Sequence, residues 1–342
     1  MLKSRDSLVV HFDDQMGKRN GKMGHGVLRF TSNPIAGCID RNRFGENSFD
    51  VLGYGPRCPV VRDVAEALPL GGQVLVLGMA PAGGRLPTYM FEEVDQAIDG
   101  GLSVINGLHE PLANRYPKLR AGQWIWDIRQ EPEDLGIASA RAAALDNRRL
   151  LIVGTDMAIG KMTSGIEIWR ESLRRGIHAE FLATGQIGIC VSGRGVPLDA
   201  IRVDYACGAV ERMVMDAADA ELQVIEGQGS IMHPGSASTL PLLRGSCPTH
   251  LVLCHQAGSD KLADHDISFP RLSELITLYE DIASACGGFL RPKTIGIALN
   301  TSSLDNNDAL EAIGRFSEET SLPVVDPLRG DVKLLVDALF DE

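Results

Sequence analysis

The feature that most constrains the fold is the segment LLIVGTDMAIGKMTSGIEIW, residues 150–169. A short apolar run, Leu150–Val153, leads into a loop flanked by glycines, and a stretch with helical spacing, Lys161–Arg175, follows without a break. A buried strand, a glycine-containing loop and a helix in this order form the phosphate-binding unit of α/β proteins. The segment therefore predicts a phosphate-binding loop, and the alternative is an ordinary strand–helix turn with an incidental lysine.

The predicted loop supplies three kinds of group that bind a diphosphate. These are inward-pointing backbone N–H groups, the positive end of a helix dipole and the side chain of Lys161. The candidates for cofactor binding are Gly154, Thr155, Asp156, Ala158, Gly160, Lys161, Met162 and Thr163.

Two departures from the regular Walker A pattern bear on the chemistry. Five residues rather than four separate Gly154 from Gly160, and Met162 stands where Ser or Thr would ligate Mg²⁺. Thr163 offers a hydroxyl one residue later, about 100° further round a helix. We therefore expect a loop that binds a diphosphate without hydrolysing it. The use of Mg²⁺ stays open, and no metal site is predicted.

The rest of the second half alternates between apolar runs and helical stretches. Strands are predicted at Ala179–Ala183, Leu222–Ile225, His250–Cys254, Thr294–Leu299 and Pro323–Val325, and helices at Asp204–Ala217, Leu272–Cys286, Asp308–Glu318 and Val332–Phe340. Apolar strands without polar alternation, separated by helices, indicate a parallel sheet covered on both faces. The fold class is therefore α/β.

The first half shows a similar but weaker pattern. Strands are predicted at Gln73–Leu77, Ser103–Ile105 and Trp124–Asp127, and helices at Phe91–Asp99 and, rich in alanine, Leu135–Leu145. Residues 1–50 contain several turn signals and predict no clear elements. A length of 342 residues suggests two domains, and we place them at 1–145 and 146–342.

Charge and composition exclude several function classes. With 33 Lys and Arg against 45 Asp and Glu, the net charge is −12, which disfavours nucleic acids and anionic membranes as partners. No apolar run reaches the length of about 18 residues that indicates a membrane span, and the N-terminus turns acidic before a signal peptide could develop. Seven scattered cysteines without a C-x-x-C pair predict reduced thiols. We expect a cytoplasmic protein that acts on small molecules, as a homodimer or larger homo-oligomer.

Polar segments follow three predicted strands, at the edge where α/β sheets bind ligands. Thr184–Gly188, with Gly185 and Gln186, is expected to wrap a ligand with backbone amides. Glu226 is placed as a Walker B acid or a general base. Asn300 is expected to contact a purine base, and His233 is a further acid/base candidate. For each residue the alternative is a polar loop at a strand end.

A second polar cluster contains residue types that bind metals: His255, Asp260, Asp264, His265 and Asp266. Its spacing fits no standard zinc helix, so a solvated loop is the preferred interpretation.

Several motifs together resemble known proteins. GTDMAIGKMT, ATGQIG and VIEGQGS are similar to the dethiobiotin synthetase branch of P-loop proteins. With RVDYACGAVE, VIEGQGSIMHPG and GLHEPL, the whole chain resembles a bacterial family that joins an N-terminal Rossmann-like domain to a variant P-loop domain. That family includes D-glutamate N-acetyltransferases, so the resemblance implies transfer of an acetyl group from acetyl-CoA to an acidic D-amino acid.

The implied reaction assigns roles to the candidates. The P-loop would hold the CoA diphosphate, and Glu226, or else His233, would take a proton from the attacking amine. Backbone N–H groups of a glycine loop would stabilise the oxyanion. Arg85, Arg115 and Arg194 are candidates to bind the carboxylates of the acceptor. Two other readings stay open: an ATP-dependent ligase or kinase, which Met162 argues against, and a non-enzymatic nucleotide sensor or scaffold.

Overall fold

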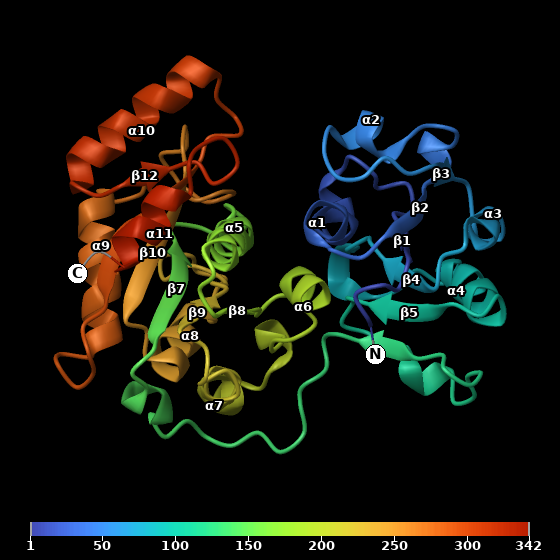
Figure 1. Cartoon of the computed structure of the whole chain (residues 1–342), viewed down its shortest axis with the longest axis horizontal. Coiled ribbons are helices and arrows are strands. Elements are labelled where there is room, and N and C mark those ends of the chain that lie inside the picture. Colours follow the sequence, from blue (N-terminus) through green and yellow to red (C-terminus); the bar gives the residue numbers. More distant parts are fainter. Residues whose placement is uncertain (1, 341–342) are drawn as a thin grey trace. The chain divides into compact units, whose positions relative to one another are not determined.

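The computed structural model describes residues 2–340, and the chain divides into two compact units (Figure 1). The first unit runs to Glu131 and includes Gln186–Ala200, and the second consists of Pro132–Gly185 and the chain from Ile201 onward. Each unit has a parallel six-stranded sheet, so the predicted α/β class with two domains is confirmed. The predicted division at 146 had assigned 132–145 to the first domain and 186–200 to the second.

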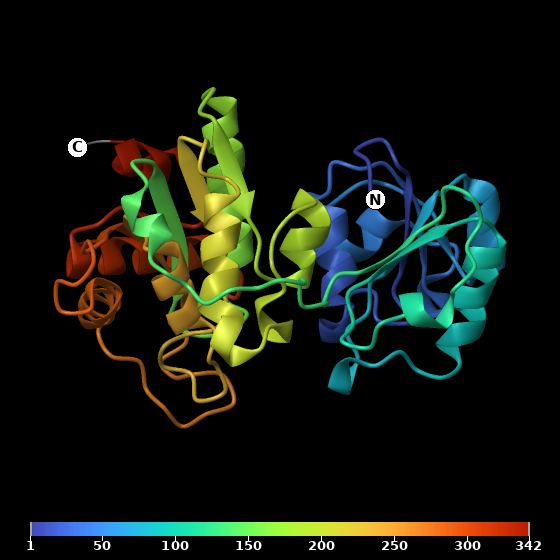
Figure 2. The ribbon, with the colours of Figure 1, turned by 90° about the horizontal axis from the view of Figure 1, so that it is seen from below.

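The sheet of the first unit has the strand order β3-β2-β1-β4-β5-β6, with every pair parallel. The strands are β1 (Leu8–His11), β2 (Ile35–Ile39), β3 (Val60–Val61), β4 (Val74–Leu77), β5 (Ser103–Asn106) and β6 (Ile125–Asp127). The helices are α1 (Lys22–Phe30), α2 (Ser48–Leu52), α3 (Val64–Ala67), α4 (Met90–Asp99) and α6 (Gln186–Ser192). Helix α1 covers one face and α4 the other (Figures 1 and 2). This strand order is that of a Rossmann fold, whose ligands bind at the carboxyl ends of the strands.

The sheet of the second unit has the order β12-β11-β10-β7-β9-β8 and is also parallel. The strands are β7 (Arg148–Gly154), β8 (Ala179–Leu182), β9 (Leu222–Ile225), β10 (His250–Gln256), β11 (Lys293–Asn300) and β12 (Val324–Val325). The helices are α5 (Lys161–Arg174), α7 (Val203–Met215), α8 (Thr239–Ser246), α9 (Leu272–Ser284), α10 (Asn306–Thr320) and α11 (Lys333–Phe340). Of the helices within 2–340, none is long and apolar enough to cross a membrane.

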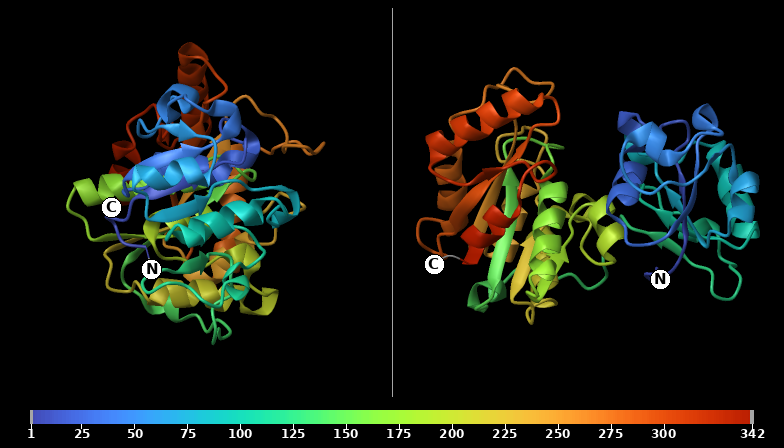
Figure 3. Two further views of the ribbon diagram at one scale, coloured as in Figure 1. Left: turned by 90° about the vertical axis from the view of Figure 1, so that its right-hand side faces the viewer. Right: turned by 45° about the horizontal axis from the view of Figure 1, so that its top comes forward.

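The central strand of the second unit positions the loop that follows it. Leu150, Leu151 and Ile152 of β7 are fully buried, because α5 and α11 cover one face of the sheet and α8 and α9 the other (Figures 1 and 3). Strand β7 pairs with β9 and β10, and Gly154 lies opposite Cys254. The residues that follow β7, β9 and β10 therefore meet at one edge of the sheet.

The helix predicted over Leu135–Leu145 is wrong. Only Arg141–Ala144 forms a short 3-10 helix, and Ala140 before it has a positive φ of 62°. The backbone N–H groups of Ser139 and Arg141 donate to the carboxylate of Glu211 on α7. Because the side chain of a distant residue satisfies these donors, alanine content does not decide the conformation of this segment.

Candidate active site

The loop between β7 and α5 surrounds a buried lysine. Ala158 and Gly160 have positive φ values of 57° and 112°, and Gly160 is the N-cap of α5. Lys161, the first residue of α5, is 6% exposed, and its Nζ donates to the carbonyl oxygen of Asp156 at 2.6 Å. Burial lowers the pKa of Lys161, against the opposing effects of Cys254, Asp156 and Glu226. The loop therefore holds a desolvated cation among backbone groups, as an anion-binding loop requires.

Two side chains from other elements fix the shape of this loop. Asn300, at the end of β11, donates from Nδ2 to the carbonyl oxygen of Ile159 at 3.2 Å. Tyr279 of α9 is buried, and its hydroxyl donates to the carbonyl oxygen of Gly154 at 2.7 Å and accepts from Ile231 N. Asn300 was predicted to contact a purine base, and the structure places it beside the loop, whereas Tyr279 carries no motif that could have pointed to it.

Glu226 follows β9 directly and is 6% exposed. Its Oε2 accepts the backbone N–H groups of Thr184 at 2.8 Å and Gly185 at 3.1 Å. A Cβ atom at Gly185 would stand 3.3 Å from Glu226 Oε1, so the absent side chain leaves room for the carboxylate. The residue after Glu226, Gly227, must also lack a side chain, because a Cβ atom there would lie 1.5 Å from the carbonyl oxygen of Ile152.

Asp156 connects the loop to His233 and to the chain after β10. Its Oδ1 lies 4.0 Å from His233 Nε2, and its Oδ2 accepts the N–H of Ala263 at 2.8 Å. His233 Nδ1 accepts the backbone N–H of Gly235, so a neutral His233 carries its proton on Nε2, toward Asp156. The structure thus places His233, the second acid/base candidate, beside the loop.

The cluster from His255 to Asp266 is not a single site. His255 is buried on β10, where its Nδ1 lies 3.0 Å from the hydroxyl oxygen of Thr155, and burial lowers its pKa to about 4. Asp260, Asp264, His265 and Asp266 are exposed, as expected for a solvated loop. Within residues 2–340, no group of three or more His, Cys, Asp or Glu side chains could hold a metal ion.

Met162 and Thr163 are the second and third residues of α5, and both are half-buried. The hydroxyl that follows them, that of Ser164, donates to the carbonyl oxygen of Gly160 at 3.0 Å. Ser164 is therefore engaged within its own helix, and the position after Lys161 has no oxygen ligand to offer.

The loop predicted at Thr184–Gly188 is wrong from Gln186 onward, because Gln186 begins helix α6. Gln186 belongs to the first unit, where its Oε1 accepts from Arg129 Nη2 at 2.7 Å. Residues 186–188 form the first turn of this helix, whose N–H groups have no partner within the helix, so the change from loop to helix does not by itself remove these backbone donors.

All three arginines predicted to bind the acceptor lie in the first unit and are exposed: Arg85, Arg115 and Arg194. The guanidinium of Arg115 stacks on the ring of Phe91, 4.0 Å from its centre. Exposure weakens an arginine–carboxylate pair, and the half-buried Arg129 of this unit, whose Nε is buried, was missed. It lies two residues after the end of β6, and no motif of the sequence singles it out.

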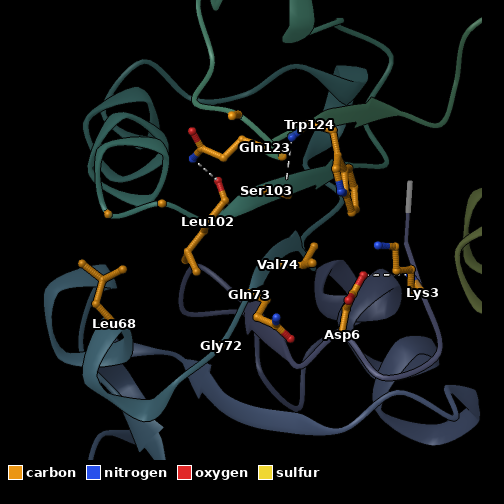
Figure 4. Close-up of a pocket in the computed structure, with 14 residues that line it drawn as sticks. Lys3, Asp6, Leu68, Gly72, Gln73, Val74, Leu102, Ser103, Gln123 and Trp124 are labelled. Atoms are coloured by element: carbon orange, nitrogen blue, oxygen red, sulfur yellow. Dashed lines mark hydrogen bonds between the residues drawn. The ribbon is translucent and has the colours of Figure 1, made fainter.

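A cavity of about 500 Å³ in the first unit lies at the amino ends of its strands (Figure 4). Gln123 donates to the carbonyl oxygen of Leu102 and the N–H of Trp124 donates to Ser103 Oγ, so these polar groups of the wall are paired within the protein. Ligands of parallel sheets bind at the opposite edge.

Comparison with known proteins places both units in one family. Residues 41–131 match a Rossmann-like domain of unknown function, DUF1611_N, and residues 136–336 match the P-loop domain of the same family, DUF1611_C. A solved structure of a DUF1611 family protein from Anabaena variabilis is 44% identical and superposes with a TM-score of 0.94 over 99% of this chain and 100% of that one.

Two curated relatives carry an activity in their names. D-glutamate N-acetyltransferases from Pseudoalteromonas sp. and Tritonibacter scottomollicae are each 35% identical over 80% of this chain and 83% of their own length. The predicted resemblance is confirmed, and the chain belongs to the DUF1611 family, with its N-terminal Rossmann-like and C-terminal P-loop domains.

Proposed function

We propose that this protein is an N-acetyltransferase that moves the acetyl group of acetyl-CoA to the amine of D-glutamate. The observation that carries the proposal is the 35% identity to two D-glutamate N-acetyltransferases over 80% of the chain. The loop around Lys161 agrees with it, since this loop combines a buried cation with a methionine at the magnesium position.

The CoA diphosphate is assigned to the loop from Gly154 to Gly160. Lys161 Nζ now donates to the carbonyl oxygen of Asp156, and a phosphate oxygen would take that place. A bound diphosphate would also oppose the effect of burial on Lys161, because a nearby negative charge favours the charged form of the lysine. Acetyl transfer breaks no P–O bond, so Met162 in place of a magnesium ligand is compatible with it.

The acetyl transfer itself needs a base and a place for negative charge. The amine nitrogen attacks the thioester carbonyl, the new C–N bond forms, the C–S bond breaks and the thiolate of CoA leaves. An amino-acid ammonium must lose a proton before it attacks, and the nitrogen loses a second proton as the amide forms. We assign the base to Glu226, with His233 as the second candidate, and the oxyanion to backbone N–H groups of the glycine loops.

Thermal unfolding in the presence of ligand tests the assignment of the loop. Acetyl-CoA at 100 times its dissociation constant stabilises a folded protein by about 2.7 kcal/mol, a clear shift of the melting temperature. We expect this shift for the wild type and for Lys293→Ala, an exposed lysine of β11, and its loss in Lys161→Ala.

Thiol release from acetyl-CoA in the presence of D- or L-glutamate then tests the activity. A melting shift with Mg-ATP alone, with no thiol release, would contradict the proposal and favour a ligase or kinase.

A further inference from the structure

One arginine of the first unit, Arg129, lies half-buried at the carboxyl edge of its sheet. Arg129 follows β6, and the N–H of Ile128 before it still donates to the carbonyl oxygen of Asn106 at the end of β5. Its side chain is 12% exposed, and Nη2 lies 2.7 Å from Gln186 Oε1 and 3.1 Å from Asp199 Oδ2. Two side chains therefore hold the guanidinium in place, both from the segment Gln186–Ala200.

The Nε–H of Arg129 is buried and has no hydrogen-bond partner. A buried donor without an acceptor is uncommon, because removing it from water costs about 1–3 kcal/mol, and more for a charged group. Such a donor in an edge that binds ligands points to an acceptor supplied by the ligand.

The surroundings of Arg129 carry an excess of positive charge. Lys22, the first residue of α1, has its pKa lowered by loss of water and by the nearby charges of Arg129 and Arg19. Loss of water lowers the pKa of Arg129 as well, and Asp199 is the acid that opposes the shift in both groups. Among the charges that act on Lys22, two cations, Arg129 and Arg19, stand against one carboxylate, Asp199, so the cluster favours an added anion.

The packing brings these groups to the ligand-binding edge. Helix α6 packs on α1, and a Cβ atom at Gly107, in the loop after β5, would lie 3.4 Å from both the Gln186 side chain and Met23 of α1. In the strand order of this sheet the crossover direction reverses between β1 and β4, and α1 directly follows β1. Ligands of doubly wound sheets bind at this reversal.

We propose that Arg129 and Lys22 bind a carboxylate of the acidic amino acid that accepts the acetyl group. The inference rests on the proposed function for the identity of the acceptor, and on the first unit alone for the site. The orphan Nε–H and the Lys22 ammonium are donors that match a carboxylate, and the positive end of α1 adds to their field. A phosphate of CoA has related chemistry, so the test separates the two anions.

Titration calorimetry with glutarate, a dicarboxylate without an amine, tests the site independently of turnover. We expect the wild type and the control Arg62→Lys, an exposed arginine paired with Glu66, to bind glutarate. Arg129→Lys keeps the charge and loses the Nε donor, and Lys22→Gln removes an exposed charge. Each should weaken glutarate binding about 10–100-fold, the range of a charge-assisted hydrogen bond. A wild type that does not bind glutarate, or variants that bind it as the wild type does, would overturn the site.

Kinetics distinguish this inference from the proposed function. In Arg129→Lys and Lys22→Gln we expect the KM for D-glutamate to rise about 10–100-fold, with the KM for acetyl-CoA unchanged. A rise in the KM for acetyl-CoA instead would assign the cluster to a CoA phosphate and overturn the inference while leaving the acetyltransferase intact. A wild type that binds glutarate but releases no thiol with D-glutamate would overturn the proposed function and support the carboxylate site.

Discussion

Glu226 Oε2 accepts the backbone N–H groups of Thr184 and Gly185, at 2.8 and 3.1 Å. The carboxylate that follows β9 is thus held by the main chain that follows β8, next to it in the sheet. These backbone donors survive substitution of Thr184 by any residue except proline, so the two hydrogen bonds depend on the main chain rather than on the Thr184 side chain. A substitution of Glu226 that keeps these two hydrogen bonds can therefore test its catalytic role without disturbing the fold.

The first prediction concerns Glu226→Gln. The glutamine carbonyl oxygen still accepts the two N–H groups, but an amide cannot take a proton from the amine. We expect kcat for acetyl transfer to fall about 10²–10⁴-fold, the usual contribution of a general base, with a melting temperature close to that of the wild type. Thiol release measures kcat, and thermal unfolding followed by far-UV circular dichroism measures the melting temperature. An unchanged kcat would move the role to His233, which His233→Asn then tests.

The second prediction uses two glycines as a matched pair. A Cβ at Gly227 would lie 1.5 Å from the carbonyl oxygen of Ile152 in the central strand, whereas Gly314 on α10 has nothing within 4 Å. Gly227→Ala should cost about 3 kcal/mol of unfolding free energy or more and should abolish the melting shift with acetyl-CoA. Gly314→Ala should stabilise the protein by about 0.5–1 kcal/mol, since alanine favours a helix. Urea unfolding measures both, and equal effects would refute the steric explanation.

The second unit could be predicted closely because its signals are local. Its strands are continuous apolar runs, and helices such as α5 begin at a glycine and end near another, so each boundary has a cause within a few residues. The elements that the sequence did not predict, such as helix α1, depend on contacts between residues far apart in the chain. Helix α1 contains two glycines, which disfavour a helix, but Gly24 packs against Phe12 and Gly26 against Ile187, where larger side chains would not fit.

The third prediction concerns Glu211, which decides the conformation of residues 139–141. Burial alone would raise the pKa of Glu211, but the N–H groups of Ser139 and Arg141 and the Arg141 guanidinium hold it below its ordinary value. Glu211→Ala leaves these donors without their acceptor and should cost about 3 kcal/mol of unfolding free energy. The exposed Glu221→Ala should change it by less than about 0.5 kcal/mol. A small effect of Glu211→Ala in urea unfolding would show that other contacts fix the segment.

The candidate site was predictable to the extent that its residues follow strands. Lys161 was named from the strand–glycine loop–helix pattern, and Glu226 and Asn300 because the carboxyl ends of parallel strands share an edge. Tyr279 and Arg129 were not found, since a tyrosine within a helix and an arginine after a short strand have no distinctive spacing. Their roles depend on which backbone carbonyl or carboxylate the fold brings to them, and a single sequence does not contain that information.

The last prediction is the pH dependence that His255 gives to the P-loop unit. The folded protein keeps this imidazole neutral, because burial lowers its pKa from 6.5 to about 4. Between these values the unfolded chain binds the proton more readily than the folded one, so stability falls as the pH falls from 6.5 toward 4. A shift of this size corresponds to about 3 kcal/mol in all. In His255→Asn, whose amide can still bond to Thr155 and does not titrate, this part of the acid dependence should vanish. Urea unfolding of the wild type and of His255→Asn at pH 7 and pH 4.5 measures this difference. An equal loss of unfolding free energy in the two proteins would assign the acid sensitivity to other groups.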